Sequence, residues 1–365
     1  MKIAVDAMGG DNAPEAIVEG AVMASRECKT KVILIGDEEI LTKELKKFDT
    51  QGLSIFIKHA PEVIGMDEAP SVALRKKKNC SIKVANEIVK NGEANAVVSA
   101  GNTGAALAAS TLILRRLEGV DRPAIATTFP TSTGPTVVLD VGANVDCKPI
   151  QLFQFGIMGN IYARYILGKS RPRVGLLGIG EEDSKGNEST REAFQMFKRS
   201  SLNFIGNVEG KEVFSGVSDV IVCDGFTGNV ALKTCEGLAE LFGNMLKDTF
   251  SQSLKSKLAY SLIKSGIQSF RKSLDYSEYG GAPLLGVNGI CIICHGSSNA
   301  KAIKNAISLA ERFSINKVNL HIQEDIELNS EIYGLKVGKA KFWQQIRDSF
   351  SFTSKEEEEE EDSEP

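Results

Sequence analysis

Small polar residues follow apolar runs at four places in this chain, and their chemistry suits the binding of an anion. The two closest copies are Ala96–Gly104 and Val220–Asn229, and the other two begin at Val137 and Val174. Such loops lie where parallel strands end and helices begin, so bare backbone N–H groups meet the positive end of a helix dipole there. We therefore expect neighbouring loops to converge on one electropositive crevice that binds a group such as phosphate.

The segment Ser99–Gly104 is the best local candidate for an anion cradle. Its glycines let the backbone approach a ligand closely, while Asn102 and Thr103 add side-chain donors. The competing interpretation is a tight strand-to-helix turn in which Asn or Thr caps the helix. The second copy, Asp224–Asn229, favours the binding interpretation because it offers the same donors at another strand end.

His295 follows a further apolar run and precedes a Gly-Ser-Ser-Asn loop, so we place it at another strand end before a helix. One imidazole is compatible with a catalytic, a capping or a core position. Cys291, Cys294 and His295 also match the spacing of a c-type haem attachment motif. We reject haem, because a strand would direct the two cysteines to opposite faces.

Several common kinds of active site are excluded or disfavoured. The chain has no Gly-x-x-x-x-Gly-Lys-Ser/Thr loop and no Gly-x-Ser-x-Gly elbow. The segment Gly178–Gly180 lacks the third glycine of the dinucleotide fingerprint and precedes three acidic residues, which disfavours a nicotinamide cofactor. Three His and seven scattered Cys give no zinc pattern. We therefore predict no metal, no cofactor and a reaction in which the substrates supply the reactive groups.

Alternating strands and helices must position these loops. Continuous apolar runs indicate strands that are buried on both faces. Their alternation with helices predicts an α/β fold with a doubly wound, largely parallel sheet and helices on both faces. We expect strands at Lys2–Ala7, Lys31–Ile35, Ser54–Ile57, Ala96–Ser99, Ala124–Thr128, Thr136–Leu139, Arg173–Leu177, Asn203–Asn207, Val220–Cys223 and Gly289–Ile293. We expect helices up to about Arg26, at about Glu38–Lys47, over most of Ser71–Asn91 and at Ala105–Leu117.

The composition bounds the domain organisation and the location. We expect one α/β catalytic domain at 1–345, with a helical insertion at about 241–275, and a disordered acidic tail at 346–365. The formal net charge is −4, but eight acidic residues lie in the tail, and the body without them carries 39 acidic and 43 basic residues. The basic residues are not interleaved with aromatic ones, so nucleic acid is not an expected partner. Scattered cysteines and the lack of an export signal favour the cytoplasm.

The stretch Leu241–Leu274 has apolar residues at every fourth position, with lysines and arginines between them. This spacing predicts a protruding helical hairpin. One interpretation is a basic amphipathic surface that lies on an anionic membrane. The other is an ordinary hairpin that packs on the body or on a second subunit.

Together, several motifs resemble one family, the bacterial phosphate acyltransferases called PlsX. The resemblance covers about residues 2 to 335. The matching segments are Val5–Pro14, Ser99–Gly104, Leu139–Asn144, Gly178–Glu182 with Lys185–Glu188, Asp224–Lys233, Tyr279–Gly286 and His295–Ser298.

The resemblance implies that acyl carrier protein bearing an acyl group reacts with inorganic phosphate to give acyl phosphate and free carrier protein, for phospholipid synthesis. It implies a Rossmann-like fold similar to phosphate acetyltransferases and isocitrate-type dehydrogenases. It also implies a homodimer that contacts the membrane peripherally and could meet the downstream membrane acyltransferase. The stretch Leu241–Leu274 is then expected to contact the second subunit and the membrane surface.

Phosphate dianion is a nucleophile near neutral pH, so this reaction requires no protein nucleophile. Our hypothesis assigns phosphate or oxyanion binding to Gly101, Asn102, Thr103 and Asn229, charge neutralisation to Lys185, and assistance at the carbonyl or the departing thiolate to His295 with Ser297. Asp6 and Asp224 are expected to orient donors, because a carboxylate repels phosphate. The remaining candidates for phosphate or substrate binding are Gly10, Asn12, Ser99, Asp140, Asn144 and Gly228.

Two other classes of function stay open from the sequence. The first is a different enzyme, either a phosphotransacetylase that uses acyl-CoA or a hydroxy-acid dehydrogenase. The second is a non-enzymatic scaffold on the inner membrane surface, whose basic helices bind lipid or partners. An assay for acyl phosphate separates the enzymes, and substitution of the polar loop residues separates an enzyme from a scaffold.

Overall fold

The computed structural model describes residues 1–251 and 280–333, together with residues 256, 260, 264 and 266. In this part of the chain, eleven strands form one sheet in the order β3-β2-β1-β4-β11-β10-β5-β6-β9-β7-β8. The strands are β1 Lys2–Asp6, β2 Lys31–Gly36, β3 Ile55–His59, β4 Ala96–Ser99, β5 Ala124–Phe129, β6 Thr136–Leu139, β7 Arg173–Gly178, β8 Asn203–Glu209, β9 Val220–Val222, β10 Ala282–Leu285 and β11 Ile290–Ile293.

Helices alternate with most of these strands along the chain. The α-helices are α1 Glu15–Cys28, α2 Glu38–Leu45, α3 Pro70–Lys76, α4 Ser81–Lys90, α5 Thr103–Ile113, α6 Pro149–Tyr165, α7 Glu188–Arg199, α8 Gly225–Ser251, α10 Ala300–Ile315 and α11 Val318–Leu328. Short 3₁₀ helices are η1 Gly210–Glu212 and η3 Ser330–Tyr333.

Two parallel groups of strands make up the sheet. Strands β3, β2, β1, β4 and β11 run parallel to one another, and so do β6, β9, β7 and β8. Strand β10 pairs antiparallel with β11 and with β5, and β5 pairs antiparallel with β6. Three successive reversals therefore leave the two parallel groups running in opposite directions.

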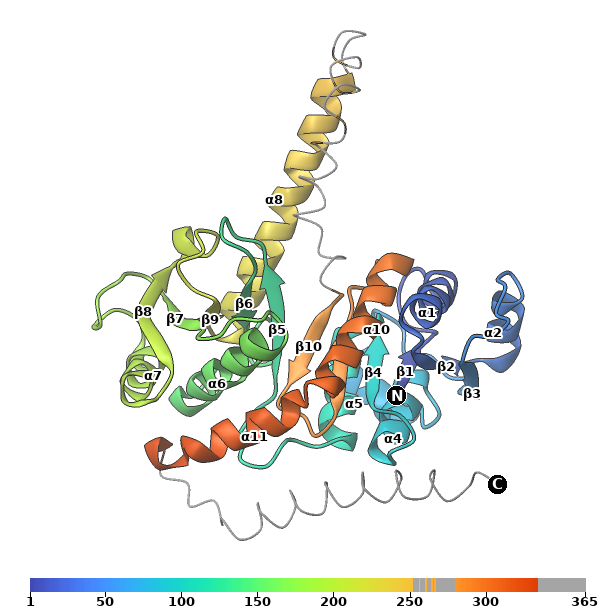
Figure 1. Ribbon diagram of the computed structural model, residues 1–365, viewed down its shortest axis with the longest axis horizontal. Coiled ribbons are helices and arrows are strands. Elements are labelled where there is room, and N and C mark those ends of the chain that lie inside the picture. The colour runs from blue at the N-terminus through green and yellow to red at the C-terminus, as the bar shows by residue number, and fades with distance from the viewer. Residues whose placement is uncertain (252–255, 257–259, 261–263, 265, 267–279, 334–365) are drawn as a thin grey trace, which may run out of the picture.

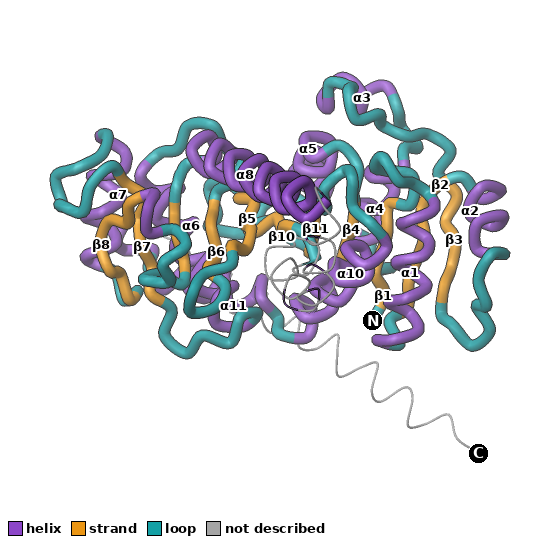
Figure 2. The backbone as a smooth tube through the Cα atoms, turned by 90° about the horizontal axis from the view of Figure 1, so that it is seen from above, coloured by secondary structure: helices purple, strands orange, loops and turns teal. Residues whose placement is uncertain are grey.

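Apolar side chains cover both faces of the sheet and form two cores. One core contains side chains of α1, α6, α7, α10 and α11, and the other contains side chains of α3, α4 and α5, with α8 packed against it. Figure 2 shows α5 and α8 on the same side of the strands, with α11 on the other side. The sheet is therefore buried between two helical layers, as the continuous apolar runs predict.

Local capping chemistry sets where the helices around the site begin. Asn102 caps α5, since its Oδ1 accepts the N–H of Ala105 at 3.0 Å. Asn187 caps α7 in the same way through the N–H of Thr190 at 2.9 Å. Asp224 precedes α8 and its Oδ1 accepts the N–H of Thr227 at 2.8 Å. Each cap pairs a helix N–H that would otherwise lack an acceptor within the helix.

The predicted fold class is confirmed, and so are the ten predicted strands, within a few residues at their ends. Strand β10 was missed, and the three antiparallel pairings depend on it and on β5. The single helical region expected at Ser71–Asn91 is two helices, α3 and α4, separated at Lys77–Cys80.

Helix α8 begins at Gly225, well before the expected insertion at 241, and it rises away from the rest of the molecule (Figure 1). Most of 252–279 lies outside the described residues, as does the predicted tail at 346–365. None of the described helices combines the length and the apolar character that a membrane span requires.

Candidate functional site

A cavity of about 170 Å³ lies over strands β5, β10 and β11, between the start of α5 and the first turns of α8. Three of the predicted site residues line it: Thr103, Asn229 and His295. The other lining residues are Ile125, Thr127, Thr128, Val141, Leu232, Lys233, Glu236, Gly281, Ala282, Ile293 and Cys294. Apolar side chains dominate this set, so the cavity joins a few polar groups to an apolar floor.

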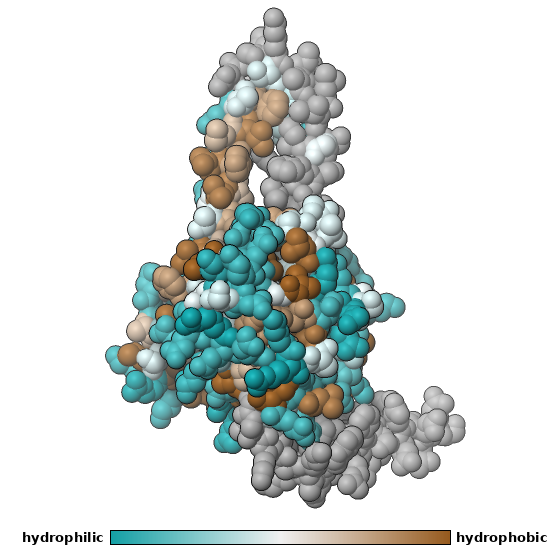
Figure 3. All heavy atoms as spheres, turned by 90° about the vertical axis from the view of Figure 1, so that its left-hand side faces the viewer, coloured by the Kyte–Doolittle hydropathy of each residue, from teal (hydrophilic) through white to brown (hydrophobic). Residues whose placement is uncertain are grey.

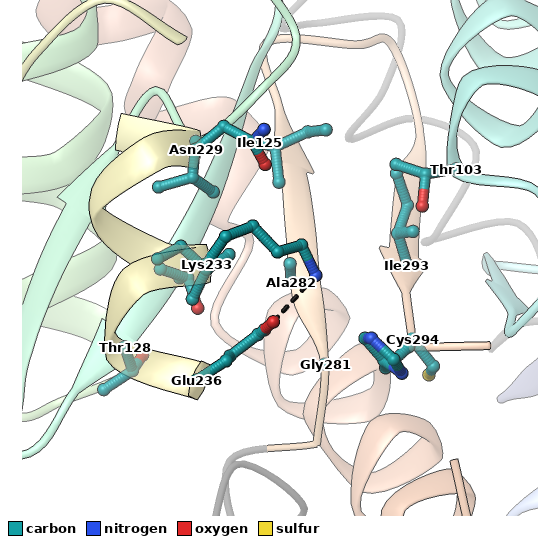
Figure 4. A pocket seen from close by; sticks show the side chains of 14 residues that line it. Thr103, Ile125, Thr128, Asn229, Lys233, Glu236, Gly281, Ala282, Ile293 and Cys294 are labelled. Carbon is teal, nitrogen blue, oxygen red and sulfur yellow. Dashed lines mark hydrogen bonds and ion pairs between the residues drawn. The ribbon is translucent and has the colours of Figure 1, made fainter. Parts of the chain in front are cut away.

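Helix α8 contributes one face to this cavity. The lining positions Asn229, Leu232, Lys233 and Glu236 are three, four and seven residues apart along the helix, which puts them on one side of it. In Figure 4 the Lys233 side chain extends from α8 into the cavity, and a dashed line joins it to Glu236. The Lys233 Nζ lies 2.7 Å from Glu236 Oε2. The positive charge in this wall is therefore balanced by a negative one.

The facing wall comes from α5 and from the loop after β11. Thr103 is the first residue of α5, and its side chain faces the cavity from the side opposite Asn229 (Figure 4). The ring Nδ1 of His295 lies 2.7 Å from the hydroxyl of Ser297 and accepts the backbone N–H of Ser297 at 3.2 Å. Acceptance at Nδ1 favours the tautomer that carries its proton on Nε2. His295 and Ser297 therefore form one unit, as the sequence-based hypothesis pairs them.

Cys294 lines the cavity but is not a reactive thiol. Burial raises the pKa of Cys294 to about 12, with Cys291 adding to the effect. A thiol with such a pKa stays protonated near neutral pH and is a poor nucleophile. Cys291 packs in one core and Cys294 in the other, so the two cysteines face opposite sides, as the rejection of haem assumed.

Asp6, Ser99 and Gly101 form a hydrogen-bonded chain behind the start of α5. The Ser99 hydroxyl donates to Asp6 Oδ2 at 2.7 Å and accepts the Gly101 N–H at 3.1 Å. Burial raises the pKa of Asp6, although the hydrogen bond from Ser99 opposes this. A Cβ on Gly9 would lie 2.8 Å from the Gly101 Cα, so two backbones meet closely here. These hydrogen bonds fix the turn between β4 and α5, and that turn positions Thr103.

The side chain of Asn102 is fully engaged within the protein. Its Nδ2 donates to the carbonyl oxygens of Gly65, Met66 and Glu68 at 2.8 to 3.3 Å, while its Oδ1 caps α5. The capping interpretation of this loop is therefore realised, and Asn102 holds the segment before α3 against α5.

Asn12 and Gly10 join the first loop to the loop after β11. Asn12 Nδ2 donates to the carbonyl oxygens of Ser297 and Ser298 at 3.1 and 3.3 Å. Gly10 has a positive φ of 112°, and a Cβ there would lie 3.0 Å from the Ala100 carbonyl oxygen and 3.1 Å from the Gly296 carbonyl oxygen. Glycine is required because a side chain would be strained by this φ and crowded by that backbone. These two residues lock the His295 loop in place.

Asp140 and Asn144 form a second buried cluster, at the end of β6. The Asp140 carboxylate accepts the N–H groups of Ile125, Ala143 and Asn144 and the side-chain amide of Asn144, at 2.6 to 3.1 Å. Burial raises the pKa of Asp140, while these donors oppose the effect. Asp140 has no exposed surface. Its carboxylate therefore shapes the loop and does not face the cavity.

The start of α8 packs directly on this cluster. The Gly225 N–H donates to the Asn144 carbonyl oxygen at 2.7 Å. A Cβ on Gly228 would overlap the Asp140 carbonyl oxygen and lie 2.9 Å from Cys223 Sγ. Asp224 is the cap described above. Asp224 and Gly228 therefore position Asn229, which is the member of this segment that reaches the cavity.

Lys185 lies apart from these groups. It is exposed, on the loop between β7 and α7, and it is not among the residues that line the cavity. Its backbone N–H donates to the Glu182 carbonyl oxygen at 3.0 Å. The role assigned to Lys185 stays a prediction.

We expected the neighbouring loops to converge on one crevice, and Thr103, Asn229 and His295 do line one cavity, but the strands before them do not end at one edge of the sheet. The two parallel groups run in opposite directions, so β4 and β11 end at one edge and β6, β7 and β9 end at the other. Helix α8 starts at the edge where β9 ends and runs back across the face of the sheet. It therefore brings Asn229 opposite Thr103, although the two residues follow strands that end at opposite edges (Figure 4). The same helix also brings Lys233 and Glu236 to the cavity, and the sequence-based hypothesis did not include these two residues. Their spacing after Asn229 was the signal that could have found them.

Comparison with known proteins identifies relatives along most of the chain. The family described as "Fatty acid synthesis protein" matches residues 1–321. A protein of Geotalea uraniireducens named phosphate acyltransferase is 56% identical over 333 residues, which is 91% of this chain and 96% of that protein. A phosphate acyltransferase of Geobacter sulfurreducens is also 56% identical over 333 residues, with the same shares covered.

Solved structures with a similar fold are more distant in sequence. A phosphotransacetylase from Streptococcus pyogenes aligns with a TM-score of 0.60 at 17% identity, over 86% of this chain and 94% of that one. The EutD phosphotransacetylase from Staphylococcus aureus aligns with a TM-score of 0.55 at 15% identity, with the same coverage. At these identities the likeness shows a common fold.

Proposed function

Because the chain belongs to the phosphate acyltransferase family and is an acyltransferase, we propose that it converts acyl-[acyl carrier protein] and inorganic phosphate to acyl phosphate and free carrier protein. The acyl phosphate would serve phospholipid biosynthesis. The observation that carries the proposal is the cavity, in which Thr103, Asn229 and His295 surround an apolar floor.

In the proposed reaction a phosphate oxygen attacks the thioester carbonyl carbon directly. A tetrahedral intermediate forms, the carbon–sulfur bond breaks, and the departing thiolate takes up the proton that hydrogen phosphate loses. The protonated state of Cys294 supports direct attack, since this cavity thiol is a poor nucleophile. Holding both substrates in one cavity removes much of the entropic cost of their meeting.

Polar groups at the rim then act on the developing charge. We assign Thr103 and Asn229 as donors to phosphate or to the oxyanion, where one well-placed donor contributes about 3 kcal/mol. His295, oriented by Ser297, assists at the carbonyl or at the thiolate. Asp6, Ser99, Asn102, Asp140, Asn144 and Asp224 act as positioning residues, because their side chains are hydrogen-bonded within the protein.

The reaction is tested with the full-length protein, inorganic phosphate and one acyl group presented on carrier protein and on coenzyme A. We expect acyl phosphate, measured as the hydroxamate after hydroxylamine treatment, with the carrier-protein thioester as the better donor. Preference for the coenzyme A thioester would replace the proposal with a phosphotransacetylase. Absence of acyl phosphate from both donors would overturn it, and reduction of a nicotinamide by a hydroxy acid would support a dehydrogenase.

Lys185 does not line the cavity, so its charge-neutralising role rests on the sequence-based hypothesis. That hypothesis predicts that Lys185→Ala lowers turnover by about 100-fold, the size of effect seen when one charge-stabilising donor is removed. Its exposure predicts a change in unfolding free energy within about 0.5 kcal/mol. Lys198→Ala, on α7, is the control, because that lysine is exposed like Lys185, has no assigned role in the reaction and pairs with Asp183. A Lys185→Ala enzyme with unchanged turnover would remove Lys185 from the mechanism.

The exposed part of α8 supports proposals about partners and location. Figure 3 shows hydrophobic residues gathered along the protruding helix, and Leu238, Leu241, Phe242 and Met245 are 47 to 59% exposed there. Exposed apolar stripes of this kind mark sites of association. We propose a cytoplasmic homodimer that contacts an anionic membrane peripherally and hands its product to the downstream membrane acyltransferase.

A further inference from the structure

Lys233 and Glu236 form an ion pair in the wall of the cavity. Neither was among the candidate site residues named from the sequence, although Lys233 ends the matching segment Asp224–Lys233. They are three residues apart on α8, and their charged atoms lie 2.7 Å apart. Their side chains are 53% and 36% exposed, so both reach the open space (Figure 4). Among the described residues that line the cavity, Lys233 is the one lysine or arginine.

We propose that Lys233 is the cationic anchor for the phosphate substrate, and that Glu236 is a counter-ion that phosphate displaces. The proposal rests on the function proposed above, in which inorganic phosphate is the acceptor. Lys233 thereby contacts the substrate, whereas Glu236 acts through Lys233.

The position of Lys233 relative to the other polar groups supports this role. Asn229 lies one helical turn before Lys233 on the same face, and Thr103 lies across the cavity (Figure 4). His295 also lines the cavity. A phosphate bound to the Lys233 ammonium would therefore lie among groups that can donate hydrogen bonds. Charge-assisted hydrogen bonds are stronger than neutral ones, so the ammonium would bind phosphate more strongly than a neutral donor would.

The chemistry of the pair allows an exchange of partners. An ion pair between partly exposed side chains contributes little stability, so breaking it costs little. The lysine ammonium has a flexible stem of four carbons, which lets it move from a carboxylate to a ligand nearby. A phosphate dianion carries more charge than one carboxylate and competes well for the ammonium. Glu236 meanwhile keeps the empty cavity near neutrality.

Opposite effects on phosphate binding are expected from changes to the two partners. Lys233→Met is predicted to raise the KM for phosphate at least about 10-fold and to leave the KM for the thioester within about 2-fold. Lys233→Arg restores the charge and should recover part of the loss. Glu236→Gln removes the competing carboxylate and should lower the KM for phosphate by about 2- to 5-fold.

Lys247→Met is the matched control for these variants. Lys247 is an exposed lysine on the same helix and is not among the residues that line the cavity. Its replacement makes the same change in charge and volume, and we expect phosphate kinetics like those of the unchanged protein. If Lys247→Met and Lys233→Met raise the KM for phosphate to a similar extent, the effect comes from the overall positive charge of α8. That result would contradict the role of Lys233 as the phosphate anchor.

Binding is also measured without turnover, by thermal unfolding with sulfate and with phosphate. The unchanged protein should be stabilised by both anions, Lys233→Met should lose most of that shift, and Glu236→Gln should gain. An unchanged shift and an unchanged phosphate KM in Lys233→Met would overturn the anchor. A raised KM in Glu236→Gln would overturn the displaced counter-ion.

Failure of the proposed function has a different signature, since the unchanged protein would then form no acyl phosphate at all. In that case the anion-dependent stabilisation still decides whether Lys233 binds the anion. If Lys233→Met does not fold, the role of Lys233 is tested with Lys233→Arg and Glu236→Gln. The KM for phosphate and the stabilisation by anions in thermal unfolding are measured for both variants.

Discussion

Asp140 and Asp219 are both buried aspartates, and their neighbours give them opposite electrostatics. Asp140 is surrounded by neutral N–H donors, and burial raises its pKa. Burial also disfavours charge on Asp219, but hydrogen bonds from Arg173 and Lys169 outweigh it and lower the pKa of Asp219 to about 2. The Arg173 Nε lies 2.9 Å from Asp219 Oδ2. The first aspartate shapes a loop, and the second joins the beginnings of β7 and β9.

The depressed pKa of Asp219 predicts how stability depends on pH. An unfolded aspartate has a pKa of about 3.9, so the ionised form is favoured in the folded protein. The pair should contribute about 2 kcal/mol above pH ~4, and this contribution should vanish as the pH falls from about 4 to about 2. Urea unfolding of the unchanged protein and of Asp219→Asn across this range measures the difference. A difference that does not shrink toward low pH would contradict the assignment.

At the scale of secondary structure, α8 decides whether the cavity exists. Its first turn is held by the Asp224 cap and by close packing of Gly225 and Gly228 on the Asp140 loop. One side of the helix then presents Asn229, Leu232, Lys233 and Glu236 to the cavity. The position of the start of α8 therefore sets the geometry of one whole wall.

Gly228→Ala is predicted to displace α8, because the added methyl group would overlap the Asp140 carbonyl oxygen. Overpacking of this kind costs about 1–3 kcal/mol, and we expect turnover to fall with it because Asn229 and Lys233 move. Gly237→Ala on the same helix has nothing within 4 Å and should be neutral or stabilising by up to about 1 kcal/mol. Equal stability of the two variants in thermal unfolding would contradict this packing argument.

At the scale of the whole molecule, α8 has two different sides. The residues that line the cavity occupy one side, and the exposed Leu238, Leu241, Phe242 and Met245 fall on the other, further along the helix. The helix rises beyond the body (Figure 1), and these four side chains are exposed in the single chain. A second copy of the chain is the partner that we propose for it.

Lys substitutions at Leu241 and Phe242 are predicted to turn a dimer into a monomer, because burial of these apolar side chains would drive the association. Light scattering after gel filtration measures the mass of the particle. Glu240→Lys, at an exposed neighbouring position outside the stripe, is the control for added positive charge. A monomeric unchanged protein, or a double variant that remains dimeric, would contradict the assignment of this stripe to a subunit contact.

Much of the fold follows from local patterns in the sequence. Continuous apolar runs followed by Gly, Asn, Asp or Ser predicted ten strands and the loops after them, since burial on both faces and helix capping are local requirements. Strand β10 was not predicted, because Ala282–Leu285 is only four residues long and contains a proline. A proline within a short apolar run weakens the sequence pattern that indicates a strand. The role of Asn102 was ambiguous for a chemical reason, because an asparagine side chain can cap a helix through its oxygen and can donate to an anion through its nitrogen.

The sequence by itself therefore determined the family, the α/β class and the strand–loop–helix units, because each of these is written in neighbouring residues. The tertiary structure decided which loops meet. Pairing between strands far apart in the chain sets the two parallel groups in opposite directions. Helix α8 then crosses the face of the sheet and brings Asn229, Lys233 and Glu236 into the cavity that Thr103 and His295 also line. No local pattern carries that information, because the direction of a strand depends on the partner beside which it comes to lie.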